Sequence, residues 1–376
     1  MVETSLEFGR AVLRGINKYL VTHRQWSVSF EPGDLIKTIP DWLDRWNGNG
    51  AIIRATSQDF VDLLRSKKIP FVNLGDFVNY DESTRIWSDQ YAIGEMAATH
   101  LMERGYRNYA CCSFTGHLWA RQRTQRFAEY VTSRGSQCVS FESQWGTSRD
   151  HSWELQQTQI VNWLMRLPKP VGIFCCNDIR GLHVIDACQR AKISVPDEVA
   201  VIGVDNDTLV CDFCDPPLTS VILNAEQIGF DAAMQLEHMM SGQQSQQQEL
   251  LIKPLGVATR QSTDTLAIDD PLVAASLKMI REQSCNGLTV EQVMEVVPIS
   301  RSVMEKKFRR YLGRSPQQEI RHVQIKRIKE LLRETDLTLQ EIAEKTGFQH
   351  PEYLSVVFKR ETDETPGAYR KRVTVS

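Results

Sequence analysis

The sequence VGIFCCNDIRGLHVIDACQRAKISVPDEVAVIGVDND, residues 171–207, contains two short apolar runs separated by a stretch of helical spacing. The runs at 171–176 and 199–204 are almost continuously hydrophobic, which is typical of parallel strands whose sheet is covered on both faces. Apolar side chains between them, at 179–191, recur at the period of a helix. A strand, a helix and a second strand in this order predict a doubly wound α/β architecture.

The same alternation continues on both sides of this stretch. Further apolar runs occur at residues 50–56, 70–76 and 109–116. Helical spacing occurs at residues 3–20, 58–67, 90–104, 119–134, 156–166 and 225–240. We therefore predict that residues 1–263 form one α/β unit. The glutamine-rich stretch 241–249 is expected to be a loop inside this unit, because an apolar, strand-like stretch follows it.

Polar residues follow the apolar runs, at the points where the predicted strands end. They are Asp76, Asp89, Asn177, Asp178, Asp205, Asn206 and Asp207. In open α/β sheets, ligands bind beyond the carboxyl ends of the strands. A helix cap or a turn explains any one of these residues by itself. Their accumulation without a basic phosphate-binding loop favours a neutral polyhydroxylated ligand over a nucleotide.

The composition is that of a globular protein. The chain has 376 residues, of which 41% are hydrophobic and 24% charged, so two or three domains are expected. No apolar stretch reaches the roughly 18 residues that a membrane-spanning helix needs, and the first residues lack the basic and apolar parts of a leader. We expect a cytoplasmic protein without a membrane partner.

Nine cysteines are scattered along the chain, and this odd number argues against a disulfide framework. Four of them lie in apolar runs, where a thiol behaves as a small hydrophobe. Cys211 and Cys214 have the spacing of half a zinc site, but no second Cys or His pair stands at ligand spacing. We expect neither a metal ion nor another cofactor.

Charge divides the chain into two parts. Residues 271–376 contain 19 Lys and Arg against 14 Asp and Glu, a net charge of +5, whereas residues 1–270 contain 25 against 33, a net charge of −8. A basic C-terminal part suits a polyanionic partner. The polar stretch 264–271 is expected to be a linker, so that residues 272–376 form a second domain.

Strand signals vanish in this second domain, and capping-box patterns begin two short helices at Thr289-x-x-Gln292 and Thr338-x-x-Glu341. A turn and a longer helix follow each of them, with Ser300 as the first N-cap and Gly347 in the second turn. Two helix-turn-helix units on one connecting helix, 315–335, could reach two successive major-groove segments. A generic helical bundle is the alternative, but Lys and Arg gather around both second helices, which favours DNA binding.

Residues 338–372, TLQEIAEKTGFQHPEYLSVVFKRETDETPGAYRKR, resemble the second helix-turn-helix of the AraC/XylS-type transcription regulators. The likeness covers the Gly-Phe turn, the Phe-Lys step and the Pro-x-x-Tyr-Arg ending. The first copy departs from the family at Met294, where a small residue is common, and at Pro298, where Gly is common. The resemblance implies an all-α tandem helix-turn-helix domain that binds double-stranded operator DNA.

The same resemblance implies which side chains meet the DNA. The base-facing positions of the family match Ser302, Glu305 and Lys306 in the first unit, and His350, Glu352, Ser355 and Val356 in the second. Glu accepts from cytosine, Lys donates to guanine, and Val contacts the thymine methyl group. The cations expected to contact phosphates, which position a protein without specifying sequence, are Arg301, Arg309, Lys359 and Arg360.

Residues 1–263 resemble the effector domain of LacI/GalR-type regulators, which is similar to periplasmic sugar-binding proteins and has two doubly wound lobes. Matching segments include SDQYAIGEMAATHLMERGYRNYA (88–110), FCCNDIRGL (174–182) and DPPLTSV (215–221). By this resemblance a sugar cleft is lined by Asp89, Arg123, Asp178 and Asp205. Such domains open with a central strand, whereas helical spacing here starts near Met1. We therefore hypothesise that roughly 15 to 25 preceding residues are missing from this sequence.

An effector domain of this type followed by an AraC-type unit is similar to the xylose operon regulators of enteric bacteria. The resemblance implies a transcription regulator, most simply an activator induced by D-xylose that forms a homodimer and contacts RNA polymerase. The alternatives are another sugar, repression, or a sugar-binding protein or enzyme without DNA binding. Because no G-x-S-x-G, Walker, H-E-x-x-H or G-x-G-x-x-G motif occurs, we expect that the chain is not an enzyme.

Overall fold

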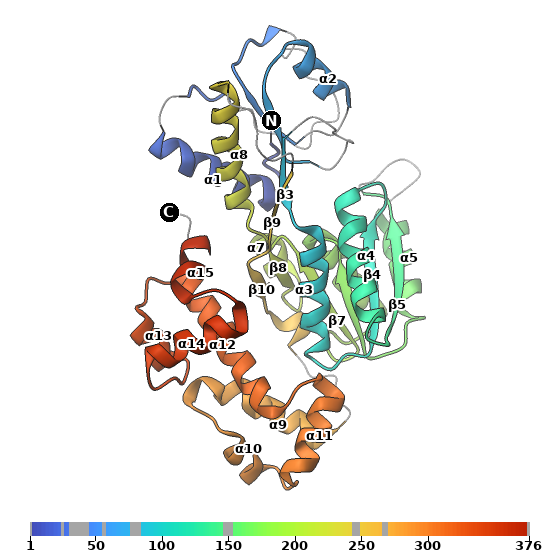
Figure 1. Ribbon diagram of the computed structural model, residues 1–376. Helices are drawn as coiled ribbons and strands as arrows, with labels where there is room; N and C mark the ends of the chain where they lie inside the picture. The colour runs from blue at the N-terminus through green and yellow to red at the C-terminus, as the bar shows by residue number, and fades with distance from the viewer. Residues whose placement is uncertain are drawn as a thin grey trace. The chain divides into compact units, whose positions relative to one another are not determined.

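The chain divides into two compact units (Figure 1). A computed structural model describes residues 2–23, 26–29, 45–54, 58–75, 84–145, 153–242, 249–264 and 270–373. Unit 1 comprises Met1–Leu101 and Arg107–Thr265, and unit 2 comprises Met102–Tyr106 and Leu266–Ser376. Three features of the sequence analysis lie wholly or largely outside the described residues, so they stay predictions: Asp76, the glutamine-rich loop and the linker.

The smaller sheet of unit 1 has the strand order β1-β2-β3-β9, and all of its neighbouring strands are parallel. The strands are β1 (Ala51–Ile53), β2 (Phe71–Asn73), β3 (Thr84–Ser88) and β9 (Glu249–Ile252). Val72 packs with helices α1 (Glu7–Thr22) and α8 (Ala225–Met240). Phe71 packs with α2 (Gln58–Ser66) instead. Because adjacent residues of a strand face opposite sides, helices cover both faces of this sheet.

The larger sheet of unit 1 has the order β10-β8-β7-β6-β4-β5, and only the β10–β8 pair is antiparallel. Its strands are β4 (Asn108–Phe114), β5 (Gln137–Ser143), β6 (Val171–Cys175), β7 (Val199–Val204), β8 (Thr219–Ile222) and β10 (Gly256–Ala258). Its helices are α3 (Gln90–Met102), α4 (Leu118–Thr132), α5 (Trp153–Leu164), α6 (Asp178–Ala191) and α7 (Thr208–Phe213). Two mostly parallel sheets with covering helices are the predicted pair of doubly wound lobes.

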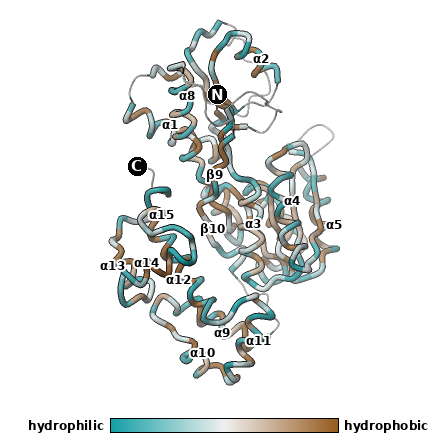
Figure 2. Tube along the Cα trace, viewed as in Figure 1, coloured by the Kyte–Doolittle hydropathy of each residue, from teal (hydrophilic) through white to brown (hydrophobic). Residues whose placement is uncertain are grey.

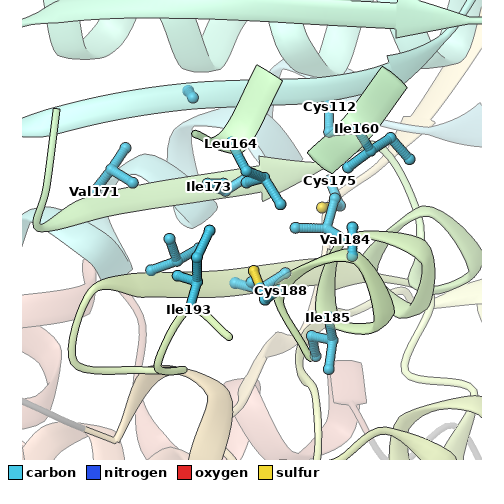
Figure 3. Close-up of a cluster of buried hydrophobic side chains, with 14 of the residues drawn as sticks. Cys112, Ile160, Leu164, Val171, Ile173, Cys175, Val184, Ile185, Cys188 and Ile193 are labelled. Atoms are coloured by element: carbon cyan, nitrogen blue, oxygen red, sulfur yellow. The ribbon is translucent and has the colours of Figure 1, made fainter. Parts of the chain in front are cut away.

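The core of the larger lobe consists of aliphatic side chains and cysteines (Figure 3). Ile173 of β6 packs with Leu164 of α5 and with Val184 of α6. All nine cysteines are free thiols. Burial raises the pKa of both Cys112 and Cys188 to about 12, so both stay protonated and pack as small hydrophobes.

Each of the five predicted apolar runs in unit 1 contains a strand, and the strand-like stretch after residue 249 contains β9 and β10. The strands that sequence analysis missed are β3, β5 and β8. In β5 every side chain is exposed or half-buried, as suits the last strand of a sheet, so no apolar run marks it. In β8 only four residues form the strand, and two of them are Thr and Ser.

The first helix begins later than its spacing predicts. Helix α1 starts at Glu7, and Leu6 before it is extended, with φ −108° and ψ 151°. Val2 is buried with Val72 and Ile86 of the smaller sheet, and residues 4–6 form a bend, so the segment before Glu7 is not helical. The prediction of a helix over residues 3–6 is therefore wrong. The hypothesis of missing preceding residues stays a prediction.

Unit 2 consists of helices in its described residues. They are α9 (Pro271–Gln283), α10 (Val290–Val296), α11 (Arg301–Leu312), α12 (Pro316–Glu334), α13 (Leu339–Lys345), α14 (Pro351–Thr362) and α15 (Pro366–Val373), with the 3₁₀ turn η3 (Ser284–Asn286). The predicted capping boxes of Thr289 and Thr338 are present, and Ser315 forms a third. Hydrophilic and hydrophobic colours alternate along these helices in Figure 2, as expected for amphipathic helices.

Each helix-turn-helix motif has its own core, and α12 contributes to both. Ile320 packs with the first motif, α10 and α11, whereas Ile328 and Leu332 pack with the second, α13 and α14. These two cores are small, so each motif depends on the helix that joins them.

Gln324 ties the two motifs together between these cores. Its buried amide donates to the carbonyl oxygens of Ser284 (3.0 Å) and Thr346 (2.9 Å). Gly347 has a φ of +74°, and a Cβ there would lie 2.7 Å from the backbone nitrogen of Gly287. The two motifs therefore meet backbone to backbone beside one polar side chain.

Unit 2 also includes the short segment Met102–Tyr106. The carboxylate of Glu103 lies 3.3 Å from Nη1 of Arg314 and 3.0 Å from Nε2 of His322. Burial by itself would raise the pKa of Glu103, but the hydrogen bond from His322 and the charge of Arg314 lower it to about 2. The segment is thereby fixed to α12 and to the turn before it.

Candidate ligand cleft and nucleic-acid interface

Arg123 lies at the centre of the candidate cleft in unit 1. Arg123 lies on the buried face of α4, and only 5% of its side chain is exposed. Its Nε donates to Oε1 of Gln90 (2.7 Å), and its Nη1 donates to the carbonyl oxygen of Cys176 (2.7 Å). Oδ1 of Asp205 lies 3.6 Å from Nη1. Residues from α3, α4 and the ends of β6 and β7 therefore meet at this guanidinium.

Asp205 stands in a strained turn after β7. Its φ is +107°, and that of Asn206 is +54°, a region that residues other than glycine rarely adopt. Such strain persists only where neighbours hold the backbone, and it concentrates at functional sites. Here the N–H of Asp205 donates to Val221 O, and that of Asn206 donates to Oγ of Ser220.

Asp178 stabilises the same turn through two hydrogen bonds. Its Oδ2 accepts from the N–H of Asp207 (2.8 Å), and its Oδ1 accepts from Oγ of Ser220 (2.6 Å). Both oxygens are thus occupied by protein groups, and burial raises the pKa of Asp178 well above its usual value. The arrangement gives Asp178 a role in positioning Asp205. Its predicted contact with a sugar stays a prediction.

Burial raises the pKa of Asp205 to about 6, although the charges of Arg123 and Arg54 act to lower it. Only 18% of the Asp205 side chain is exposed. A carboxylate that is poorly solvated and only partly paired gains from new hydrogen-bond donors. Asp205 can therefore receive the hydroxyl groups of a polar ligand.

Asp89, the fourth predicted ligand residue, precedes α3. Its Oδ1 accepts from the N–H of Ala92 (2.9 Å), which makes it the cap of that helix. The neighbouring residue Gln90 is buried and contacts Arg123, as described above. The structure thus brings Arg123, Asp205 and Asp178 together and places Asp89 at the start of the adjoining helix.

Aromatic side chains lie beside the cleft. The guanidinium carbon of Arg123 is 4.9 Å from the ring centroid of Trp119, and both His117 and Trp145 contact Trp119 at centroid distances of 5.6 and 6.1 Å. All three rings are half-buried. Phe127 is fully buried and stacks on Phe174 in the core, so it is not available to a ligand.

Sequence reasoning missed three residues of this cluster, namely Glu3, Arg54 and Gln90. Arg54 follows β1 and pairs with the buried Glu3. We searched the ends of predicted strands for Asp and Asn only. Arg54 and Gln90 also stand just after strands, but the search did not select them. Glu3 gave no signal because it was assigned to a helix.

The second helix of the first motif, α11, presents a mostly polar outer face in unit 2. The side chains of Ser302, Lys306 and Arg309 are exposed, and Glu305 is half-buried. Arg301 pairs with Glu291 of α10 (2.9 Å) and lies 3.6 Å from Glu305. The predicted phosphate contact of Arg301 would therefore compete with two carboxylates of its own motif.

Helix α14 presents the corresponding face of the second motif. Exposed side chains here are His350, Glu352, Val356, Lys359 and Arg360. Ser355 is half-buried, and its hydroxyl donates to the carbonyl oxygen of Pro351 (2.9 Å). Two large exposed side chains escaped the sequence analysis: Val303 on α11 and Tyr353 on α14. Each stands three residues before a predicted base-facing position, so helical spacing alone could have found them.

Comparison with known proteins supports both halves of this arrangement. A periplasmic binding protein-like domain matches residues 98–263, and a helix-turn-helix domain matches residues 294–372. The xylose operon regulatory protein of Escherichia coli (strain K12) is 30% identical over 373 residues, which cover 96% of this chain and 94% of that protein. The chain belongs to the family of xylose operon regulatory proteins.

Other members of the xylose operon regulatory protein family agree. The protein of that name from Haemophilus influenzae is 31% identical over 96% of this chain and 95% of its own length. A solved structure of a xylose-binding transcription activator is 29% identical, with a TM-score of 0.63 over 99% of this chain and 96% of that one.

Family membership confirms several sequence-based predictions: a periplasmic-binding-protein-like α/β part, a C-terminal helix-turn-helix part, and a transcription regulator in place of an enzyme. In the described parts of the chain, no helix is long and apolar enough to span a bilayer. Within those same parts, no group of three or more His, Cys, Asp or Glu is placed to hold a metal ion.

Proposed function

We propose that this transcription regulator binds D-xylose in the cleft around Arg123 and Asp205, and that the bound sugar controls how α11 and α14 contact operator DNA. The observation that carries the proposal is the buried Arg123–Asp205 pair, in the same chain as two helix-turn-helix motifs. Support for xylose comes from relatives that are named for the xylose operon.

The chemistry of the cleft suits a neutral sugar. Arg123 offers paired donors to ring and hydroxyl oxygens, and Asp205 accepts from adjacent hydroxyl groups. Asp89 and Asp178 complete the predicted lining of the cleft. Trp119 supplies an apolar ring beside Arg123, against which the carbon face of a sugar can pack.

The division of labour follows from the two units. In our proposal residues 1–263 bind the sugar, residues 264–271 form a linker, and residues 272–376 bind DNA. Lobe closure shifts the population between two states, which requires that the sugar and the operator each bind the two states with different affinity. We further propose a cytoplasmic homodimer that activates transcription through RNA polymerase. The related structure of a xylose-binding transcription activator supports activation.

Calorimetric titration of the full chain with D-xylose, L-arabinose, D-ribose and D-glucose tests the ligand. We expect measurable heat with xylose and at least tenfold weaker binding of the others, because one lost or misplaced hydroxyl leaves buried polar groups unpaired. A preference for another sugar would replace xylose in the proposal. Silence with every sugar would exclude the cleft assignment.

A gel-shift series with DNA upstream of sugar-catabolism genes tests the proposed sugar-controlled binding of operator DNA. Binding should weaken steeply between about 50 and 200 mM salt, because phosphate contacts release counterions. Addition of xylose should change the affinity, and operator DNA should change the affinity for xylose by the same factor. Equal sugar affinity with and without operator DNA would exclude coupling.

A further inference from the structure

Glu3 places a buried carboxylate next to the cleft. It lies in the non-helical segment before α1, and none of its side-chain surface is exposed. Oε1 pairs with Nη1 of Arg54, whereas Oε2 has no hydrogen-bond partner among the described residues. A buried carboxylate oxygen without a hydrogen-bond partner costs folding free energy, so its presence here needs an explanation.

The surroundings of Glu3 leave its side chain little freedom. A Cβ at Gly9 would lie 1.9 Å from the carbonyl oxygen of Glu3 and 2.9 Å from its carboxyl carbon, so only glycine permits this close approach. Val2 is buried in the core, and the guanidinium carbon of Arg54 lies 4.8 Å from the ring centroid of Phe8. Glu3 is thus held from both sides and cannot readily turn to solvent.

Arg54 links Glu3 to the residues of the cleft: it pairs with Glu3, and its charge acts on both Asp205 and Arg123. Arg54, its partner, lowers the pKa of Asp205, and Glu3 itself raises it, so these three groups share one electrostatic environment. Arg10 of α1 reaches Oδ2 of Asp207 at 3.1 Å, which joins the helix after Glu3 to the strained turn. Glu3 and Arg54 of the smaller lobe therefore lie near enough to Asp205 and Arg123 of the larger lobe for their charges to act on one another.

We propose that Glu3 is a specificity-determining residue, whose free Oε2 accepts a hydrogen bond from a sugar hydroxyl group and repels ligands that carry an acid group. The inference rests on the sugar-binding function proposed above. The two guanidinium groups, Arg54 and Arg123, are already balanced by Glu3 and Asp205. A neutral aldose supplies the missing donor to Oε2. An aldonic acid would bring an unbalanced negative charge beside it, which costs free energy where solvation is poor.

The experiment compares D-xylose with xylonate, its aldonic acid, by calorimetric titration of the full chain. Wild-type protein should bind xylonate at least about a hundredfold more weakly than xylose, because the carboxylate meets Oε2. Glu3→Gln should weaken xylose binding about tenfold and shrink the xylose-to-xylonate ratio at least about tenfold, because the like charge is gone. Glu226→Gln is the matched control: this half-exposed carboxylate pairs with Arg14 and Lys18 on α1, and its loss should change neither affinity.

The outcomes separate the inference from the function on which it rests. If wild-type protein binds no sugar, the proposed function fails, and the role of Glu3 fails with it. If wild-type protein binds xylose and folded Glu3→Gln keeps both the affinity and the ratio, only the role of Glu3 is overturned. Should Glu3→Gln melt below the assay temperature, Glu3→Asp replaces it. That variant keeps the charge but withdraws the oxygen, so it should weaken xylose binding and still reject xylonate; unchanged xylose binding would overturn the inference.

Discussion

Oδ2 of Asp178 accepts a hydrogen bond of 2.8 Å from the backbone N–H of Asp207, two residues beyond Asp205. The positive φ of Asp205 is thus maintained by a carboxylate from another element, the first turn of α6. The direction in which Asp205 points depends on a residue that need not contact the ligand.

Asp178→Ala should therefore destabilise unit 1 by about 2 to 4 kcal/mol, because it leaves the Asp207 N–H and the Ser220 hydroxyl unsatisfied in a buried place. Xylose binding should be lost at the same time. Thermal unfolding and calorimetry measure the two effects. Asp212→Ala, which removes a carboxylate that is 70% exposed, is the control and should alter neither. Normal stability of Asp178→Ala would contradict the positioning role.

The pKa of Asp205, about 6, gives sugar binding a pH dependence. Hydroxyl groups donate to the ionised carboxylate, so protonation below pH 6 should weaken xylose binding, by up to about tenfold per pH unit. The measurement is the Kd for xylose from pH 5 to 8. Asp205→Asn should bind weakly at every pH in that range. A flat wild-type profile would show that Asp205 does not receive the sugar.

The same pKa predicts the stability of the free protein, with the opposite sign. Because the folded pKa lies above the ordinary value of 3.8, Asp205 stabilises the fold most below pH 4, and this contribution is lost as pH rises through 6. The loss amounts to at most about 3 kcal/mol, since one pKa unit is about 1.4 kcal/mol. The unfolding free energy of the wild-type protein should thus fall relative to that of Asp205→Asn between pH 4 and 7. A difference that grows over that range would refute the sign.

Gln324→Leu should uncouple the two helix-turn-helix motifs. It leaves the carbonyl groups of Ser284 and Thr346 without their donor, which should cost about 1 to 3 kcal/mol each while they stay buried. Operator affinity should fall even though Gln324 is buried and does not face DNA. Gln318→Leu, in the first turn of α12, removes only a capping box and serves as the milder control.

Lys306→Ala tests base readout. If the exposed Lys306 meets a guanine, its loss should reduce affinity by about 1 to 3 kcal/mol at one or two operator positions only. Arg309→Ala, which should remove a phosphate contact, is expected to weaken binding equally on all sequences and to lower the salt slope by about one. Binding to a panel of single-base operator variants separates the two patterns. A uniform loss for Lys306→Ala would assign it to the backbone.

Local patterns predicted local structure well. The unit β6-α6-β7 and the capping boxes at Thr289 and Thr338 follow from side chains within a few residues of one another. The edge strand β5 could not be predicted in this way, because its partly exposed side chains form no apolar run.

The site was predicted only in part for a related reason. Family resemblance predicted both Arg123 and Asp205, and Asp205 also follows a predicted strand. Glu3 and Arg54 are 51 residues apart in the sequence, so only the folded structure shows that they form a pair. The role of Asp178 likewise depends on a hydrogen bond to a distant backbone group, which no spacing rule records.

Because Met102–Tyr106 belongs to the helical unit, that unit is not a contiguous tail of the polypeptide. A fragment that starts at Pro271 would contain both motifs but would leave Arg314 and His322 without Glu103. Truncation would thus yield an incomplete module. If this helical unit were transferred to another regulator, in the laboratory or during evolution, the recipient's own effector part would have to supply a segment compatible with Met102–Tyr106.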